Sequence, residues 1–315
     1  MKTVPIAFAF DNNLVFPACV CLSSLLMNAK DDTFYDIFIL HSSKVDLNKE
    51  QLAELLKQFS RCRIQYRVVD DTFDQSFEIR GITAATYYRL LIPELIPEYD
   101  KVIYADVDII FRMDLSELYE TEIGNNYIAA TRELGMNLTE DGQKYIHSMP
   151  ELNVGSYIQA GFIVMNNKAI LKDNVHVQFK EWSNKKLKFQ DQDILNVVCR
   201  GRIYYLSLEY NMTDYSYMFA MRKRSVIKEL FSDAEIEYAL KQGNIHYNGH
   251  KPWKKYSVNF DIWWEYYRKS PFFDQKFYFE FFYTRLNELD QLSLWKRIKI
   301  LIRYFVYGKE RFKGR

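Results

Sequence analysis

The stretch DKVIYADVDIIFR, from Asp100 to Arg112, decides the fold class of this chain. The residues on either side of its two acids, 102–104 and 109–111, are β-branched or aromatic, and they predict a buried strand near the middle of a sheet. Asp106 and Asp108 are two positions apart, and in an extended chain such side chains point to the same side. Their carboxylates can therefore converge on one ligand.

A divalent cation that carries a phosphate would suit two convergent carboxylates. Buried carboxylates need a cation or hydrogen-bond donors, and hard cations take oxygen ligands while leaving coordination positions for phosphate oxygens. An isolated Asp-x-Asp also occurs as a solvated acidic turn at the end of a strand. The pair alone does not separate these alternatives, so the remaining motifs decide.

Length and composition indicate a folded globular protein. The chain has 315 residues, of which 48% are hydrophobic and 26% charged, so it can bury a large core. We expect no membrane-spanning helix, because no apolar run reaches about 18 residues, and no signal peptide in the opening MKTVPIAFAFDNN. The four cysteines lack the spacing of a disulfide scaffold or zinc site. We therefore expect a cytoplasmic protein.

Charge is distributed unevenly along the chain. The net charge of +1 gives no reason to expect a nucleic-acid partner. Residues 290–315, however, carry eight basic and two acidic side chains, a local net charge of +6, so residues 1–289 carry −5. A basic tail on an acidic body needs an explanation.

Strands and helices alternate at the start of the chain. Residues 4–10, 35–40 and 63–69 have the composition of strands, and residues 16–27 and 46–59 have that of helices. This alternation predicts an open, mostly parallel α/β sheet, in which ligands bind beyond the carboxyl ends of the strands.

Polar residues follow two of the predicted strands. Asp11 and Asn13 come after the first strand, and Asp106 and Asp108 follow a later one. Because the carboxyl ends of parallel strands lie at one edge of a sheet, these side chains should line one shared crevice.

Two further segments carry candidate ligand contacts. A predicted helix over 83–91, with Thr83 as its cap and Pro93 near its end, places Arg89 on a helix face, where it makes either a surface salt bridge or a phosphate or sugar contact. The predicted strand over 157–166 contains Ala160-Gly161, and a glycine inside a strand often marks close approach of a ligand or of another backbone.

The predicted helix over 189–199 begins with three polar residues. Asp191, Gln192 and Asp193 lie near its positive end, where capping requires only one of them and substrate binding explains the others. Before it, residues 168–184 are predicted to form one mixed helix. After it, the polar, tyrosine-rich residues 207–224 are expected to form a loop at the mouth of the substrate site.

The segment NIHYNGHKPW, residues 244–253, combines a metal-binding and a phosphate-binding residue type. His246, on a short predicted strand, can complete a site made by two aspartates, and this donor set suits Mn²⁺ better than Ca²⁺. A lone histidine is also compatible with simple core packing. Lys251 follows a glycine turn and can neutralise a phosphate.

The last predicted helix is amphipathic and basic. Two aromatic-rich helices, 260–269 and 273–286, precede it. At about 100° per residue, the apolar side chains of 292–307 occupy an arc of roughly 140°. Lysines and arginines flank this arc, as in helices that lie on an anionic membrane surface. Docking of the helix on the protein core is the alternative.

Five motifs in this order resemble those of glycosyltransferase family 8, in particular bacterial lipopolysaccharide galactosyl- and glucosyltransferases, over about residues 4–255. They are Ala9-x-Asp11-x-Asn13, Thr86 to Arg89, Asp100 to Asp108, Gln190 to Asn196, and His246 to Trp253. The resemblance implies a GT-A type fold, a metal-dependent reaction with Mn²⁺ or alternatively Mg²⁺, a UDP-glucose or UDP-galactose donor, and a saccharide or glycolipid acceptor. It also implies retention of the anomeric configuration.

The same resemblance assigns roles to individual residues. Asp106, Asp108 and His246 would bind the metal, and Gln192 and Asp191 would be catalytic, stabilising a cationic sugar during front-face attack by the acceptor hydroxyl. The donor-binding set would be Ala9, Asp11, Asn13, Arg89, Asp106, Val107, Asp108, Gln159, Ala160, Gly161, Asp191, His246, Gly249 and Lys251.

Two positions depart from the family pattern. Gln159 stands where relatives have Asn, and Glu133 stands where the resembling galactosyltransferases have Asp. Both border the expected sugar pocket and extend one methylene further, which leaves the identity of the hexose open.

The resemblance also predicts an organisation and a location. Residues 1–256 would form the catalytic domain, and 257–315 a helical region whose basic tail, 290–315, binds the inner face of the plasma membrane. The alternatives are a metal-dependent nucleotidyl or phosphoryl transferase, against which the lack of a glycine-rich phosphate loop counts, and a non-catalytic sugar-nucleotide-binding protein.

Overall fold

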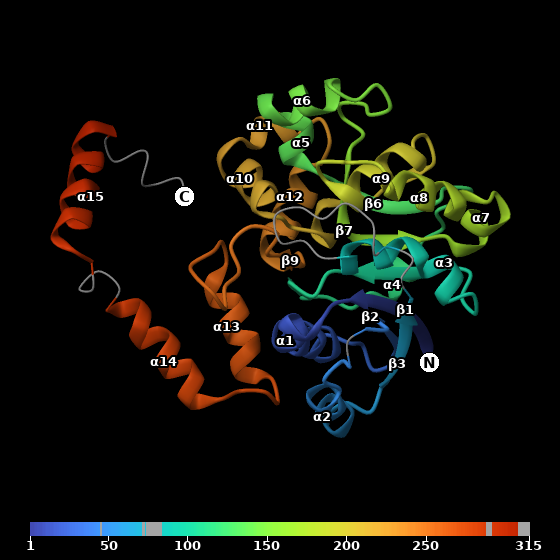
Figure 1. The fold of residues 1–315 in the computed structure, drawn as a ribbon, viewed down its shortest axis with the longest axis horizontal. Coiled ribbons are helices and arrows are strands. Elements are labelled where there is room, and N and C mark those ends of the chain that lie inside the picture. The colour runs from blue at the N-terminus through green and yellow to red at the C-terminus, as the bar shows by residue number, and fades with distance from the viewer. Residues whose placement is uncertain (45, 71–72, 74–83, 288–291, 308–315) are drawn as a thin grey trace. The chain divides into compact units, whose positions relative to one another are not determined.

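A seven-stranded sheet organises the larger of two units in the computed structural model, which describes all residues except 45, 71–72, 74–83, 288–291 and 308–315 (Figure 1). The chain divides into Met1–Phe272 and Phe273–Arg315. The predicted functional boundary after residue 256 stays a prediction.

The sheet has the strand order β3-β2-β1-β4-β7-β6-β8. Its first four strands are parallel, β7 is antiparallel to both β4 and β6, and β8 is parallel to β6. The prediction of an open, mostly parallel sheet is therefore confirmed. The bounds are β1 (Lys2–Ala9), β2 (Thr33–Ser42), β3 (Cys62–Val69), β4 (Val102–Ala105), β6 (Ile128–Arg132), β7 (Ile158–Met165) and β8 (Ile203–Tyr205).

Helices cover both faces of this sheet (Figure 1). Successive side chains of a strand point to opposite faces, so Ile6 and Phe8 of β1 pack into one apolar layer and Ala7 into the other. The first layer contains residues of α1 (Val15–Met27), α2 (Glu50–Gln58) and α4 (Ser116–Glu120). The second contains residues of the 3-10 helix η3 (Ala84–Leu91), α3 (Ile92–Leu95), α7 (Asn167–Lys172), α8 (Val175–Ser183) and α9 (Gln190–Val198).

The Asp100–Arg112 stretch forms two strands rather than one. β4 lies at the centre of the seven-stranded order, as predicted, but it ends at Ala105. β5 (Ile109–Ile110) pairs instead with β9 (Ile245–His246) in a separate two-stranded sheet. Asp106 and Asp108 therefore lie at a turn between two sheets. Their side chains converge because the backbone turns, and the expected extended geometry was wrong.

Three other expectations need correction. The 168–184 segment is broken into α7 and α8 at Asn174, whose φ of 55° is left-handed. The 207–224 segment is mostly helical: it contains the 3-10 helix η4 (Leu208–Tyr210) and α10 (Asp214–Arg222). The Thr213 hydroxyl accepts the backbone N–H of Ser216 and caps α10. Pro93 is the second residue of α3, which begins at Ile92 directly after η3, so helical structure continues past the predicted end at residue 91. Thr83 lies outside the described residues.

The described part of the first unit contains further helices. They are η1 (Asn12–Leu14), α5 (Leu134–Leu138), α6 (Glu140–His147), α11 (Arg224–Ile227), α12 (Asp233–Gln242) and α13 (Phe260–Lys269). Trp263 and Tyr267 of α13 are buried and make edge contacts with Phe16 of α1. This aromatic contact ties α13 to the sheet layer.

The described residues of the second unit form the helices α14 (Gln275–Leu286) and α15 (Leu294–Tyr307). Within it, the apolar side chains Trp295 and Phe305 of α15 are each 80% exposed. None of the helices in the described part of the chain has the length and apolar content needed to cross a bilayer.

Candidate active site

Residues that follow the neighbouring strands β1 and β4 line one cavity of about 790 Å³. The two predicted polar clusters, Asp11 with Asn13 and Asp106 with Asp108, therefore meet at one edge of the sheet. Other predicted donor-binding residues on its wall are Ala9, Arg89, Val107, Gln159, His246 and Lys251.

Asp106, Asp108 and His246 form a compact cluster in this cavity. One ligand atom from each lies within 4.8 Å of the others. The His246 Nε2 atom is 3.2 Å from Asp108 Oδ1 and 3.8 Å from Asp106 Oδ2. The sequence thus identified three residues that the fold brings together, although His246, in β9, comes 138 residues after Asp108 in the chain.

A chain of hydrogen bonds sets the orientation of His246. Gln159 Oε1 accepts the backbone N–H of Gly161 (2.6 Å) and the side-chain amide of Asn211 (2.9 Å). Asn211 therefore presents its carbonyl oxygen to His246 Nδ1, at 2.9 Å, and accepts that proton. His246 Nε2 is therefore the ring nitrogen that faces the two aspartates.

Asn211 is a functional residue that the sequence reasoning missed. It is almost fully buried, and it lies between η4 and α10 in the segment that was expected to be a loop. Its only sequence signal is a polar residue two positions before Thr213, which caps α10.

The donor set fits a divalent cation. Asp108 Oδ1 is buried without a hydrogen-bond partner among the described residues, and His246 Nε2 faces it at 3.2 Å. Gly161 keeps the space beside the cluster open, since a Cβ there would overlap Asp106 Oδ2 and His246 Cε1. Two carboxylates and an imidazole are ligands that Mn²⁺ accepts.

Lys251 places a positive charge beside Asp108. Its ammonium group contacts Asp108 Oδ2 and the Tyr247 carbonyl. Burial disfavours the charged form of Asp108, but Lys251 and His246 outweigh it and hold the pKa of that carboxyl well below its usual range. Gly249 lies in the preceding turn, where a Cβ would overlap Asp214 Oδ2.

Arg89 is buried and connects the two sides of the site. Its guanidinium lies 2.9 Å from Asp106 Oδ1 and 3.0 Å from Asp191 Oδ2, and it donates to the Ala160 carbonyl at 2.6 Å. Its charge also lies over the ring of Tyr104, 4.3 Å from the centroid. The surface salt bridge considered from sequence is therefore wrong. Arg89 instead orients the acids on either side of it.

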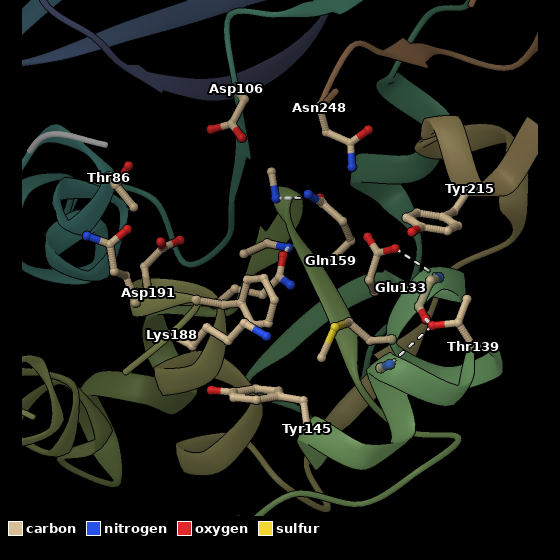
Figure 2. Close-up of a pocket in the computed structure, with 18 of the residues that line it drawn as sticks. Thr86, Asp106, Glu133, Thr139, Tyr145, Gln159, Lys188, Asp191, Tyr215 and Asn248 are labelled. Atoms are coloured by element: carbon tan, nitrogen blue, oxygen red, sulfur yellow. Dashed lines mark hydrogen bonds between the residues drawn. The ribbon is translucent and has the colours of Figure 1, made fainter. Parts of the chain in front are cut away.

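A second cavity, of about 470 Å³, continues from the first one (Figure 2). Both are lined by Thr86, Arg89, Asp106, Gln159 and Asn248. The second cavity adds the predicted residues Ala160, Gly161, Asp191 and Gln192. In Figure 2, Asp106 and Asn248 lie on one side of it and Tyr145 on the opposite side.

The start of α9 brings Asp191 and Gln192 to this cavity. The helix begins at Gln190, whose φ of 45° is left-handed. Burial, together with the nearby charge of Asp106, raises the pKa of Asp191 to about 7, although the Arg89 guanidinium pulls in the opposite direction. The Gln192 side-chain oxygen accepts the Ala160 N–H at 3.1 Å.

Glu133 is the other buried acid of the second cavity. One of its oxygens accepts the Gly135 N–H at 3.0 Å, at the start of α5. Burial raises the pKa of Glu133 to about 7, against smaller opposing effects of that hydrogen bond and of His246. The carboxyl can therefore be protonated near neutral pH, when it donates as well as accepts a hydrogen bond.

Aromatic and basic residues that were not singled out from sequence complete this wall. Tyr145 of α6, Tyr215 of α10 and Lys188 before α9 line the second cavity (Figure 2). Tyr215 packs so closely on Gly135 that a Cβ there would lie 2.6 Å from its ring. Aromatic faces beside polar groups suit a saccharide. The sequence showed many tyrosines but no pattern that selects these.

Residues 5–257 match the model of the family described as Glycosyl transferase family 8. The chain belongs to glycosyltransferase family 8. A Haemophilus influenzae protein described as a glycosyltransferase is 30% identical over 218 residues, which are 67% of this chain and 64% of that protein. This chain therefore spans slightly less than two thirds of that relative.

Two other relatives are similar over most of the chain. A Salmonella typhimurium lipopolysaccharide 1,3-galactosyltransferase is 26% identical over 261 residues, and an Escherichia coli lipopolysaccharide 1,2-glucosyltransferase is 26% identical over 268 residues. Each match covers 80% of this chain and 74% of the relative.

The fold agrees with that of a solved galactosyltransferase. The galactosyltransferase LgtC, in complex with donor and acceptor sugar analogs, superposes with a TM-score of 0.69 at 23% identity, over 87% of this chain and 98% of that one. This family 8 chain has the GT-A type fold that its sequence motifs implied.

Proposed function

We propose that this family 8 protein transfers glucose or galactose from a UDP-sugar to a saccharide or lipid-linked saccharide, with retention of configuration and dependence on Mn²⁺ or Mg²⁺. The observation that carries the proposal is the continuity of two cavities, one lined by a metal-type cluster and Lys251, the other by buried acids. The names of the lipopolysaccharide relatives support the substrate class.

The first cavity would hold the nucleotide diphosphate. Asp11 and Asn13 line this cavity and would contact the nucleoside, and Lys251, which contacts Asp108, would neutralise the diphosphate. A cation bound by Asp106, Asp108 and His246 would supply further positive charge as the sugar–phosphate bond breaks.

The second cavity would hold the sugar and the attacking hydroxyl. As the C1–O bond to UDP breaks, positive charge develops on the sugar ring, and Asp191 and Gln192 provide an anion and an amide dipole to stabilise it. The acceptor oxygen bonds to C1 on the face that UDP leaves, and its proton passes to the departing phosphate oxygen. Arg89 keeps Asp191 in place through their 3.0 Å ion pair.

A binding and turnover experiment tests this function. UDP should raise the melting temperature only when Mn²⁺ or Mg²⁺ is present, and single-turnover incubation with UDP-glucose or UDP-galactose should release UDP. Binding without release would favour a non-catalytic sugar-nucleotide-binding protein. Pyrophosphate release from a nucleoside triphosphate would instead favour the nucleotidyl transferase alternative.

We also propose that residues 290–315 bind an anionic membrane surface, which would place the enzyme on the inner face of the plasma membrane. The apolar residues of α15, including Trp295 and Phe305, are exposed within their own unit, and the segment has a net charge of +6. Deleting residues 290–315 should abolish binding to anionic liposomes and leave UDP release intact. Unchanged liposome binding would refute the membrane role.

A further inference from the structure

Asp193 lies behind the second cavity and is completely buried. Its Oδ1 accepts the hydroxyl proton of Tyr157 at 2.6 Å. Its Oδ2 accepts the hydroxyl of Tyr145 at 2.6 Å and the backbone N–H of Phe189 at 2.9 Å. The hydrogen bond from the Phe189 N–H lies at the start of α9 and uses Oδ2. Capping therefore does not explain why the other oxygen is bonded to Tyr157.

The bond from Tyr157 to Asp193 has a consequence for Gln192. A tyrosine hydroxyl has one proton to donate, and here it donates that proton in a hydrogen bond to a carboxylate, which can only accept. The Tyr157 oxygen can then only accept a further hydrogen bond, and the group facing it, at 3.4 Å, is the amide nitrogen of Gln192. The other end of that amide, Oε1, accepts the Ala160 N–H.

The two ends of the Gln192 side chain are therefore held by groups of fixed polarity. Ala160 is in the buried strand β7, and its N–H can only donate. Tyr157 precedes that strand and is 1% exposed. A reversed amide would place oxygen against oxygen at Tyr157 and N–H against N–H at Ala160, losing both hydrogen bonds.

We propose that Asp193 and Tyr157 are positioning residues that fix which end of the Gln192 amide faces each side of the sugar cavity. This rests on the proposed role of Gln192 beside the reacting sugar. Asp193 accepts the hydrogen bond of the Tyr157 hydroxyl, so the Tyr157 oxygen can only accept a hydrogen bond from the amide nitrogen of Gln192. The carbonyl dipole of Gln192 therefore keeps one direction while charge develops on the sugar. Preorganised dipoles of this kind act without reorganising during the reaction.

Tyr157→Phe tests this inference, with Tyr145→Phe as its matched control. Both substitutions remove one hydroxyl from the Asp193 carboxylate, but only Tyr157 contacts Gln192. In single-turnover UDP release from the active UDP-hexose, Tyr157→Phe should lower the rate constant roughly tenfold, the effect of about one hydrogen bond. The donor concentration for half-maximal rate should stay unchanged, and Tyr145→Phe should have a clearly smaller effect on the rate.

A double-mutant cycle separates positioning from general loss of packing. In a Gln192→Ala background, Tyr157→Phe should cause little further loss of rate, because the group that it orients is gone. Equal rates for the Tyr157→Phe and Tyr145→Phe variants, or the same tenfold loss in the Gln192→Ala background, would overturn the inference.

Two controls keep this test decisive. If Tyr157→Phe gives no cooperative melting transition, Asp193→Asn is used in its place. The asparagine side chain keeps the shape of the acid but presents an N–H donor to one of its hydrogen-bond partners. An unchanged rate of UDP release in Asp193→Asn would overturn the inference. Absence of UDP release by the wild-type enzyme would overturn the proposed function itself.

Discussion

Asp108, which is partly buried, and Asp191, which is buried, are aspartates of one candidate active site, yet their pKa values are shifted in opposite directions. Lys251 and His246 hold the pKa of Asp108 well below its usual range, whereas burial raises the pKa of Asp191 to about 7. Asp191 has the Arg89 guanidinium at 3.0 Å, but that group is shared with Asp106. The charges around each aspartate, and not the residue type, therefore set the direction of its pKa shift.

The contrast suits the two parts of the proposed reaction. At the proposed nucleotide end, the Lys251 ammonium favours the ionised form of Asp108 before any substrate arrives. At the sugar end, Asp191 and Glu133 have raised pKa values, so their charged forms are poorly stabilised in the free enzyme. An oxocarbenium-like sugar would stabilise the charged form of Asp191 most in the transition state, which is where such stabilisation raises the rate.

Removing a carboxylate from the nucleotide end should have the largest effect. Asp108→Ala deletes the buried oxygen that faces His246, so we expect UDP release to fall by about 10³-fold or more and the metal-dependent thermal shift by UDP to disappear. His246→Ala should resemble it. Asp100→Asn, an exposed acid of the same stretch, is the matched control and should behave as wild type. A retained UDP shift in Asp108→Ala would refute the metal assignment.

Removing the charge at the sugar end should separate chemistry from binding. We expect Asp191→Asn to lower the single-turnover rate about 10²-fold, while the thermal shift by UDP and Mn²⁺ stays at the wild-type value. An equal loss of UDP binding would mean that the two ends do not act independently.

Breaking the support of His246 should have an intermediate effect. Asn211→Ala removes the acceptor for His246 Nδ1, so we expect the Mn²⁺ concentration needed for the UDP shift to rise about 10- to 100-fold. At saturating Mn²⁺ the rate should return toward wild type. A rate that stays low at saturating metal would place Asn211 in the chemistry and not in metal binding.

The smallest effect should appear in the pH dependence of stability. The folded pKa of Glu133, about 7, exceeds its ordinary value of 4.5, so the folded state binds more protons between these values and stability falls as pH rises through this range. From pH 6 to pH 8, wild type should lose about 1 kcal/mol relative to Glu133→Gln. Calorimetric unfolding of both proteins checks this, and parallel stability curves would contradict it.

Much of the fold was predictable because it depends on local patterns. Apolar strand runs, alternating helices and polar residues after β1 and β4 were sufficient to predict a parallel sheet with one crevice. The loop expected over 207–224 was wrong because that expectation rested on polar composition and did not take account of Thr213, the N-cap of α10. The break at Asn174 depends on one left-handed residue that periodicity does not reveal.

The sequence by itself determined the residue types at Asp100–Arg112 and the central place of its first strand. Only the tertiary structure decided how the two acids meet. β4 ends before Asp106, β5 leaves the main sheet to pair with β9, and that pairing brings His246 beside Asp108. The roles of Asn211 and Asp193 were likewise decided by tertiary contacts, because a hydrogen bond between distant segments is specified by geometry that no local pattern encodes.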